Sequence, residues 1–173
     1  MKHVIIGTVK RSGLMHFFIW IFILVVILLF FFLSKRILRR KALKILQSEN
    51  KKVADKAIAA CLSHLQIEWL IEYEGHIENS KLLANIWGKG VMVFEYILPV
   101  QKVSKKELKQ FKKELNHRLS KYAEDNEISH FENNPTFLIS DLWFLAPSLH
   151  IEVAYISNKQ TLDYLRDIDK LEK

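Results

Sequence analysis

The sequence contains few of the residues that cross-link or break a chain: one cysteine, three prolines and five glycines among 173 residues. Because Cys61 is the single cysteine, an intrachain disulfide is excluded, and a reducing compartment suits the chain. Internal repeats and low-complexity tracts are also absent outside one apolar run. The length leaves room for one domain plus a membrane segment.

The sequence also lacks the common catalytic motifs. There is no G-x-x-x-x-G-K-[ST] phosphate loop, no G-x-S-x-G elbow and no H-E-x-x-H pair among the seven histidines. Cys61 lies beside Ala60 and Leu62 on an apolar helical face, which favours an inert buried thiol. We therefore expect a non-enzyme with no cofactor and no metal. A membrane-bound enzyme is the alternative, and it would require a pocket with convergent polar groups.

An apolar run of about 20 residues, Leu14–Leu33, is interrupted only by His16. At about 1.5 Å per residue, a helix of this length spans the roughly 30 Å hydrocarbon core. The run exceeds the apolar region of a signal peptide, and no good cleavage site follows it. The sequence therefore predicts a short tail at residues 1–13 and an uncleaved transmembrane helix at residues 14–34.

Positive charge is heavier after this run than before it. Before it lie Lys2, Lys10 and Arg11. After it lies a predicted membrane-surface group that would contact anionic headgroups: Lys35, Arg36, Arg39, Arg40, Lys41 and Lys44. Because the more positive flank tends to stay in the cytoplasm, we expect a single-pass protein of the cell (inner, cytoplasmic) membrane with its C-terminal domain in the cytoplasm.

The charge of the remaining chain differs from the formal total of +7. Residues 35–52 hold eight Lys/Arg and one Glu, which gives +7. Residues 53–173 hold fifteen Lys/Arg and eighteen Asp/Glu, which gives −3. The basic character therefore belongs mainly to the juxtamembrane segment, and the high overall isoelectric point does not indicate nucleic-acid binding.

Helical spacing continues beyond the membrane run. Residues 35–65 are predicted to form one basic juxtamembrane helix, or two with a break near residues 48–50. Residues 67–73 alternate as in a half-buried strand, although a continued helix remains open. Residues 76–90 fit either a short helix or a loop.

Residues 66–173 are predicted to form one α+β domain, a small and mainly antiparallel sheet covered by helices. Its expected strands are Val91–Leu98, Phe137–Ile139 and Leu149–Tyr155. A helix should begin at the Ser104–Glu107 capping box and end near Tyr122. Ser157 with Gln160 suggests a second capping box, ahead of a terminal helix whose seam is Leu162, Leu165, Ile168 and Leu171.

The helix after Ser104 has a basic side and an apolar side. At about 100° per residue, its lysines fall within an arc of about 120°, roughly 125° from the Leu/aromatic stripe. This lysine ridge is a predicted surface for a partner protein or DNA: Lys102, Lys105, Lys106, Lys109, Lys112 and Lys113. Simple solvation of the helix is the alternative, and no aromatic residues are interleaved for base stacking.

The stretch "GVMVFEYILPVQKVSKKELKQFKKELNHRLS" combines an alternating strand, a proline, V-x-x-V-S and a helix. Over residues 88–157 it resembles the small α+β domain upstream of the motor in FtsK/SpoIIIE-type DNA translocases and conjugative coupling ATPases. The motor itself, with its Walker motifs, has no counterpart in this sequence. The resemblance therefore implies an anchor and adaptor without a motor, and it assigns no catalytic residue.

Together these features suggest a single-pass adaptor subunit of a DNA-transfer (conjugation) or secretion-type envelope machine. Its expected partners are the lipid bilayer and other subunits of a membrane complex, with DNA and a second copy of the chain as further candidates. The alternative is a type IV secretion assembly factor whose α+β domain lies outside the cytoplasmic membrane.

Overall fold

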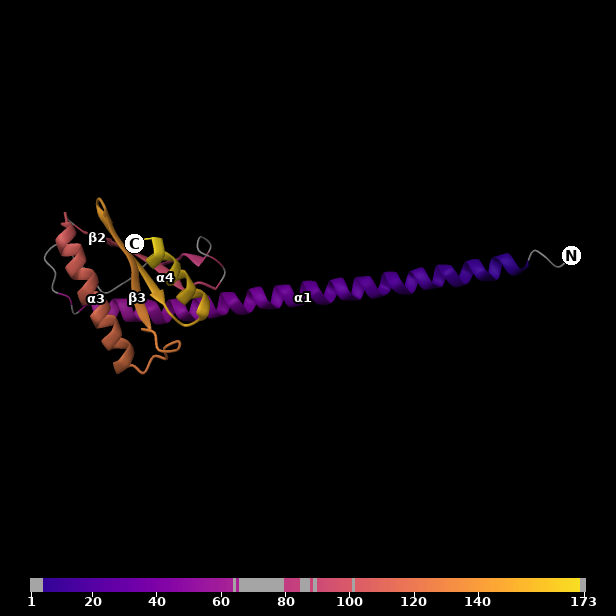
Figure 1. Cartoon of the computed structure of the whole chain (residues 1–173), viewed down its shortest axis with the longest axis horizontal. Helices are drawn as coiled ribbons and strands as arrows, with labels where there is room; N and C mark the ends of the chain where they lie inside the picture. Colours follow the sequence, from indigo (N-terminus) through magenta and orange to yellow (C-terminus); the bar gives the residue numbers. More distant parts are fainter. Residues whose placement is uncertain are drawn as a thin grey trace. The chain divides into compact units, whose positions relative to one another are not determined.

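The structure of the protein is a computed structural model that describes residues 5–63, 65, 80–84, 88, 90–100 and 102–171, with side chains from His16 onward. The chain forms two compact units, Met1–Lys44 and Ile45–Lys173 (Figure 1). The expected strand at residues 67–73 lies outside the described residues, as does most of the segment 76–90.

Helix α1 (Ile5–Ser63) runs without a break through residues 48–50 and ends two residues before the expected Leu65. In the first unit, its large apolar side chains from Phe17 to Leu33 are all exposed, at 41–73% of their surface. The exposed side chains of this segment are apolar on every side of the helix. Among the described residues, α1 is the one helix long and apolar enough to cross a membrane.

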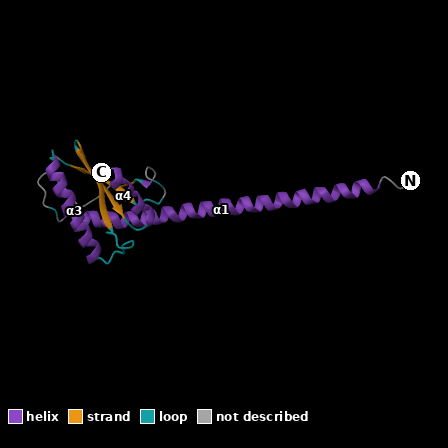
Figure 2. Ribbon diagram, in the orientation of Figure 1, coloured by secondary structure: helices purple, strands orange, loops and turns teal. Residues whose placement is uncertain are grey.

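The second unit contains a four-stranded sheet in which every neighbouring pair is antiparallel (Figure 2). The strands are β1 (Lys81–Leu82), β2 (Val93–Pro99), β3 (Phe137–Leu145) and β4 (Ser148–Tyr155), and their order is β1-β2-β4-β3. The predicted α+β class is confirmed, since helices pack against an antiparallel sheet.

Strand β3 is six residues longer than the expected Phe137–Ile139. The pairing of β3 with β4 shifts register between Ile139 and Asp141, so Ser140 is an extra residue in the strand. A bulge of this kind interrupts the alternation of apolar and polar side chains. For that reason the period-two pattern did not reveal the rest of the strand.

One face of the sheet packs against α3 (Lys105–Asp125) and the last turns of α1. α3 buries Phe111, Leu115, Leu119 and Ala123. The residues that α1 buries in this unit include Ala57, Ile58 and Leu62, each at most 1% exposed. The compact unit therefore begins within α1, at Ile45, and the helical segment that was expected to precede the domain supplies part of its core.

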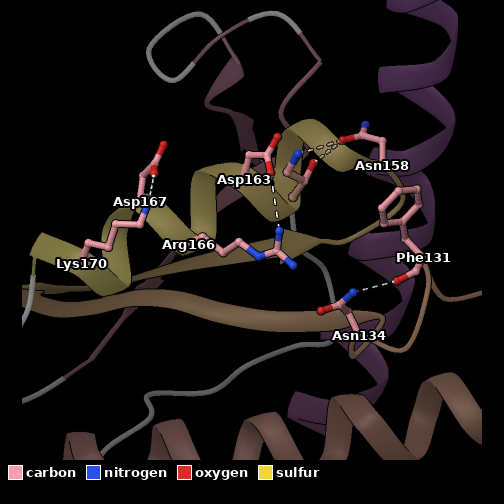
Figure 3. Close-up of polar contacts among 8 residues, drawn as sticks. Phe131, Asn134, Asn158, Asp163, Arg166, Asp167 and Lys170 are labelled. Carbon is pink, nitrogen blue, oxygen red and sulfur yellow. Dashed lines mark hydrogen bonds and ion pairs between the residues drawn. The ribbon is translucent and has the colours of Figure 1, made fainter.

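The opposite face packs against α4 (Lys159–Leu171), whose Tyr164 belongs to one buried cluster with the register partners Val93 and Ala154. Figure 3 shows Asn158, the residue that precedes α4, and the strands that run beneath this helix. Asn158 Oδ1 accepts a 2.8 Å bond from Thr161 N, so Asn158 is the N-cap. The predicted Ser157–Gln160 capping box is therefore wrong. The Ser157 hydroxyl instead accepts a 3.0 Å bond from Asn50 Nδ2 of α1.

Candidate functional site

The start of α3 confirms the predicted capping box. Glu107 N donates to Ser104 Oγ at 3.3 Å, and Ser104 N donates to Glu107 Oε2 at 2.7 Å. These bonds to the Ser104 side chain and backbone lower the pKa of Glu107. Because the Glu107 carboxylate is engaged at the cap, it is not directed at the lysines that follow.

The structure separates the lysine ridge into three kinds of residue. Lys102 precedes the N-cap and so lies outside the helix. Lys112 is half-buried, and its Nζ donates a 3.1 Å bond to the carbonyl oxygen of Ser140 in β3. The exposed ridge lysines, as we name the other four, are Lys105, Lys106, Lys109 and Lys113.

No ion pair within the described part of the chain neutralises the exposed ridge lysines. The two acids nearest to them on α3 have other partners, because Glu107 caps the helix and Glu114 binds Arg118 at 2.7 Å. α4 differs, since two of its three cations, Arg166 and Lys170, pair with acids on the same helix (Figure 3). The ridge is therefore a concentrated positive surface, whereas α4 presents balanced charge.

α3 also holds the edge of the sheet. Asn116, one turn after Lys112, accepts a 2.8 Å bond from the backbone N–H of Ile139. The two side chains thus bind the backbone groups on either side of the β3 register shift. An exposed strand edge can pair with other chains, and a covering helix prevents this. Lys112 is therefore a structural residue as well as a member of the ridge.

All six residues of the predicted membrane-surface group lie in the first unit, on the part of α1 that follows its apolar run. All six are exposed with no ion pair among the described residues, and Lys35 Nζ also lies 4.5 Å from the centre of the Phe31 ring. A cation over an aromatic face at this distance is favourable. The group therefore presents its positive charges on successive turns of the helix, where they are accessible to anionic headgroups.

A second polar arrangement lies on the sheet face that α4 partly covers. Glu95 of β2, Glu152 of β4 and Asp141 of β3 are register partners, so three carboxylates cross the sheet in one row. We name these three residues the carboxylate row. Like charges directly opposite each other on a sheet destabilise it, and such a row therefore needs compensation.

Part of this compensation comes from neighbouring side chains. His150 Nδ1 lies 2.9 Å from Glu95 Oε1, and the His150 ring stacks on Trp143 at a centroid distance of 4.9 Å. Tyr164 OH donates a 3.4 Å bond to Glu152 Oε2. Burial raises the pKa of Glu152, and the charges of Asp141 and Glu95 raise it further.

The carboxylate row was not identified from the sequence. A signal was present, because Glu95 interrupts an apolar strand, and Glu152 and His150 share one face of another. Period-two patterns place these residues on a face but do not say which strands are neighbours. The β2-β4-β3 order that aligns the three carboxylates depends on tertiary packing.

The one thiol of the chain belongs to Cys61, which is buried. Cys61 lies next to a surface hollow of about 340 Å³ that Arg118 and Asp125 also line. Burial raises the pKa of this thiol to about 11, so it is protonated at neutral pH and is a poor nucleophile. Within the described residues, no three His, Cys, Asp or Glu side chains are placed to hold a metal.

Comparisons with known proteins assign no function, so a functional proposal has to start from the geometry described above. No protein-family model, no curated protein and no solved structure matches the chain.

Proposed function

We propose that the protein is a membrane-anchored, non-catalytic adaptor subunit whose α+β unit binds a partner protein or DNA through the lysine ridge. The observation that carries this proposal is the set of exposed ridge lysines on α3 without acidic partners. They lie in a part of the chain whose formal charge is negative, so the positive surface is not a consequence of overall composition. Clustered cations bind phosphates or acidic side chains and steer their approach.

The candidate membrane span of α1 supports the anchoring part of the proposal. The basic group after the span supports a single pass through the cytoplasmic membrane with the α+β unit on the cytoplasmic side. The resemblance of residues 88–157 supports a DNA-transfer or secretion-type machine. A strand, a helix and a strand pair follow one another there as β2, α3, β3 and β4.

The first experiment determines the side of the membrane. Paired reporters, one active only in the cytoplasm and one active only outside it, are fused after Lys173. We expect activity of the cytoplasmic reporter alone. Activity of the external reporter alone would reject the proposal in favour of a type IV secretion assembly factor whose domain lies outside the cytoplasmic membrane.

The second experiment reverses the ridge charge by replacing the four exposed ridge lysines with Glu. Acidic residues are favourable in the first turn, where Lys105 and Lys106 lie, and Glu is a good helix former at the other two positions, so α3 should remain folded. Retention of duplex DNA by the full chain in nanodiscs, and cross-linking to neighbouring subunits in cells, are then compared with a Lys121→Glu variant. Lys121 is an exposed lysine later on α3 that lies outside the ridge.

We expect the reversed ridge to lose either DNA retention or one specific subunit cross-link, while Lys121→Glu keeps both. If DNA is the partner, removing one lysine that binds a phosphate should reduce the slope of log affinity against log salt by about 0.9. If the reversed ridge keeps both interactions at the wild-type level, the lysines only solvate the helix and the proposal is wrong.

A further inference from the structure

The part of the sheet face that α4 leaves uncovered has an apolar rim. On this face Ile97 of β2 and Trp143 of β3 are both register partners of His150 in β4. Ile97 is 50% exposed, and Leu145, two residues after Trp143, is 64% exposed. Among the described side chains, these two are the large apolar ones exposed in the second unit outside α1. Ile97 and Leu145 lie on the same face of the sheet, on the strands either side of β4, and exposed apolar side chains on a shared face suit an interaction site.

The carboxylate row lies directly beside this apolar rim. Glu95 precedes Ile97 by two positions, and Asp141 precedes Trp143 by two positions, so each acid shares a face with the apolar residue next to it. Asp141 is exposed, whereas the side chains of Glu95 and His150 are only 13% and 15% exposed. The surface therefore combines an accessible acid, two mostly buried acids behind it and an apolar strip.

This combination specifies the chemistry of an occupant. A cation that approaches the carboxylate row reduces the repulsion between its acids. Apolar residues on either side of that cation would cover Ile97 and Leu145. An anionic lipid surface is disfavoured, because it would bring further negative charge to the same acids.

We propose that the surface formed by Asp141, Glu95, Trp143, Ile97 and Leu145 is a docking surface for a partner-protein segment in which apolar residues flank an arginine or lysine. This surface carries charge opposite to that of the lysine ridge and lies on different elements. The protein thus has two recognition surfaces of opposite sign. One can fail its test without affecting the other.

The titratable groups around the docking surface predict how binding depends on pH. They are Glu95 of β2, His150 and Glu152 of β4, Asp141 of β3 and Tyr164 of α4. A cationic segment favours the ionised carboxylates, so binding must release protons from any carboxyl that is still protonated. Burial and the neighbouring acids raise the pKa of Glu152, so we expect affinity to increase between pH 4 and pH 7 as Glu152 loses its proton.

The test uses the full chain in phosphatidylcholine nanodiscs and a randomised library of displayed peptides. Peptides that bind the wild type are counter-selected against a Leu145→Ser variant, and affinities are measured by fluorescence anisotropy of the labelled peptides. Asp125→Asn and Ile45→Ser are matched controls, because Asp125 is an exposed acid and Ile45 is a 65% exposed apolar residue elsewhere in the unit. Thermal unfolding checks that each variant is folded.

We expect the selected peptides to carry an arginine or lysine among apolar residues. Asp141→Asn and Leu145→Ser should each weaken binding at least about tenfold, and both controls should bind as the wild type does. The proposal is overturned if no peptide depends on Leu145, or if the peptides that do lack a cation. It is also overturned if the chain dimerises in analytical ultracentrifugation and Leu145→Ser abolishes the dimer, which would make a second copy the occupant. Displacement of the peptides by phosphatidylglycerol vesicles would overturn it as well, because a membrane would then be the occupant.

Discussion

Replacing Asn116 by Ala should leave one backbone N–H at the edge of the sheet without its acceptor. The resulting loss of stability can be estimated from the contacts. Asn116 Oδ1 is the acceptor for Ile139 N–H at 2.8 Å, and Ile139 is 1% exposed. A buried donor left without an acceptor costs about 1–3 kcal/mol. Ala is a better helix former than Asn by about 0.5 kcal/mol, which partly offsets this loss. We therefore expect the free energy of unfolding to fall by about 1–2 kcal/mol.

The same logic predicts a smaller effect at Lys112. Lys112→Met keeps the alkyl chain but removes the 3.1 Å bond to the Ser140 carbonyl oxygen. Because Lys112 is half-buried, water can replace part of that bond, and we expect a loss of about 0.5–1 kcal/mol. Lys113→Met is the matched control, since Lys113 is exposed and holds no such bond, and it should change stability by less than about 0.5 kcal/mol.

Stability is measured by urea unfolding of the full chain in micelles. Tryptophan fluorescence reports the transition in a Trp20→Phe background, which removes the indole of the apolar run. Hydrogen exchange of the segment 137–145 gives a local reading, because about 1.4 kcal/mol of lost protection accelerates exchange tenfold. If Asn116→Ala is no less stable than a Gln110→Ala control and the segment exchanges at the wild-type rate, the edge-covering role of α3 is refuted.

Three further predictions concern the core, a helix cap and the carboxylate row. Leu119→Ala removes a fully buried side chain of α3 and should destabilise the unit by about 2–5 kcal/mol in urea unfolding. Asn158→Ala should cost about 1 kcal/mol through loss of the α4 cap, and a Ser157→Ala change that cost more would contradict the assignment of Asn158. Glu152→Gln retains an acceptor for Tyr164 but removes the charge. The folded-state pKa of Glu152 is raised above 4.5, so the wild type loses stability as pH rises through that raised pKa. In thermal melts, the variant should therefore match the wild type near pH 4 and be more stable than the wild type at pH 7.

The elements most accurately predicted from the sequence were those determined by local chemistry. The alternating apolar residues of β2 and the Ser104 cap of α3 need only neighbours in sequence, and the structure has both. The start of α4 was misplaced by one residue, because Ser157 and Asn158 can each serve as an N-cap. The tertiary bond from Asn50 to Ser157 decided between them.

The candidate surfaces show the same limit. A helical wheel predicted the basic side of α3, but it could not show that Lys112 reaches back to Ser140 or that Glu114 is paired with Arg118. The carboxylate row was not predicted at all, since it exists only when three strands from different parts of the chain align. Surfaces made by one helix can be predicted from sequence period, whereas surfaces made across strands depend on register.

The last turns of α1 form part of the core, and this helix is synthesised well before the strands that cover it. Ile58 and Leu62 are buried in a unit whose sheet is completed by β4, which ends at Tyr155. About ninety residues separate these segments, which corresponds to roughly 5–20 seconds of translation at typical rates. During that interval the apolar side of α1 has no completed sheet to cover it. Newly made chains should therefore bind chaperones through residues 54–62 until β4 has left the ribosome.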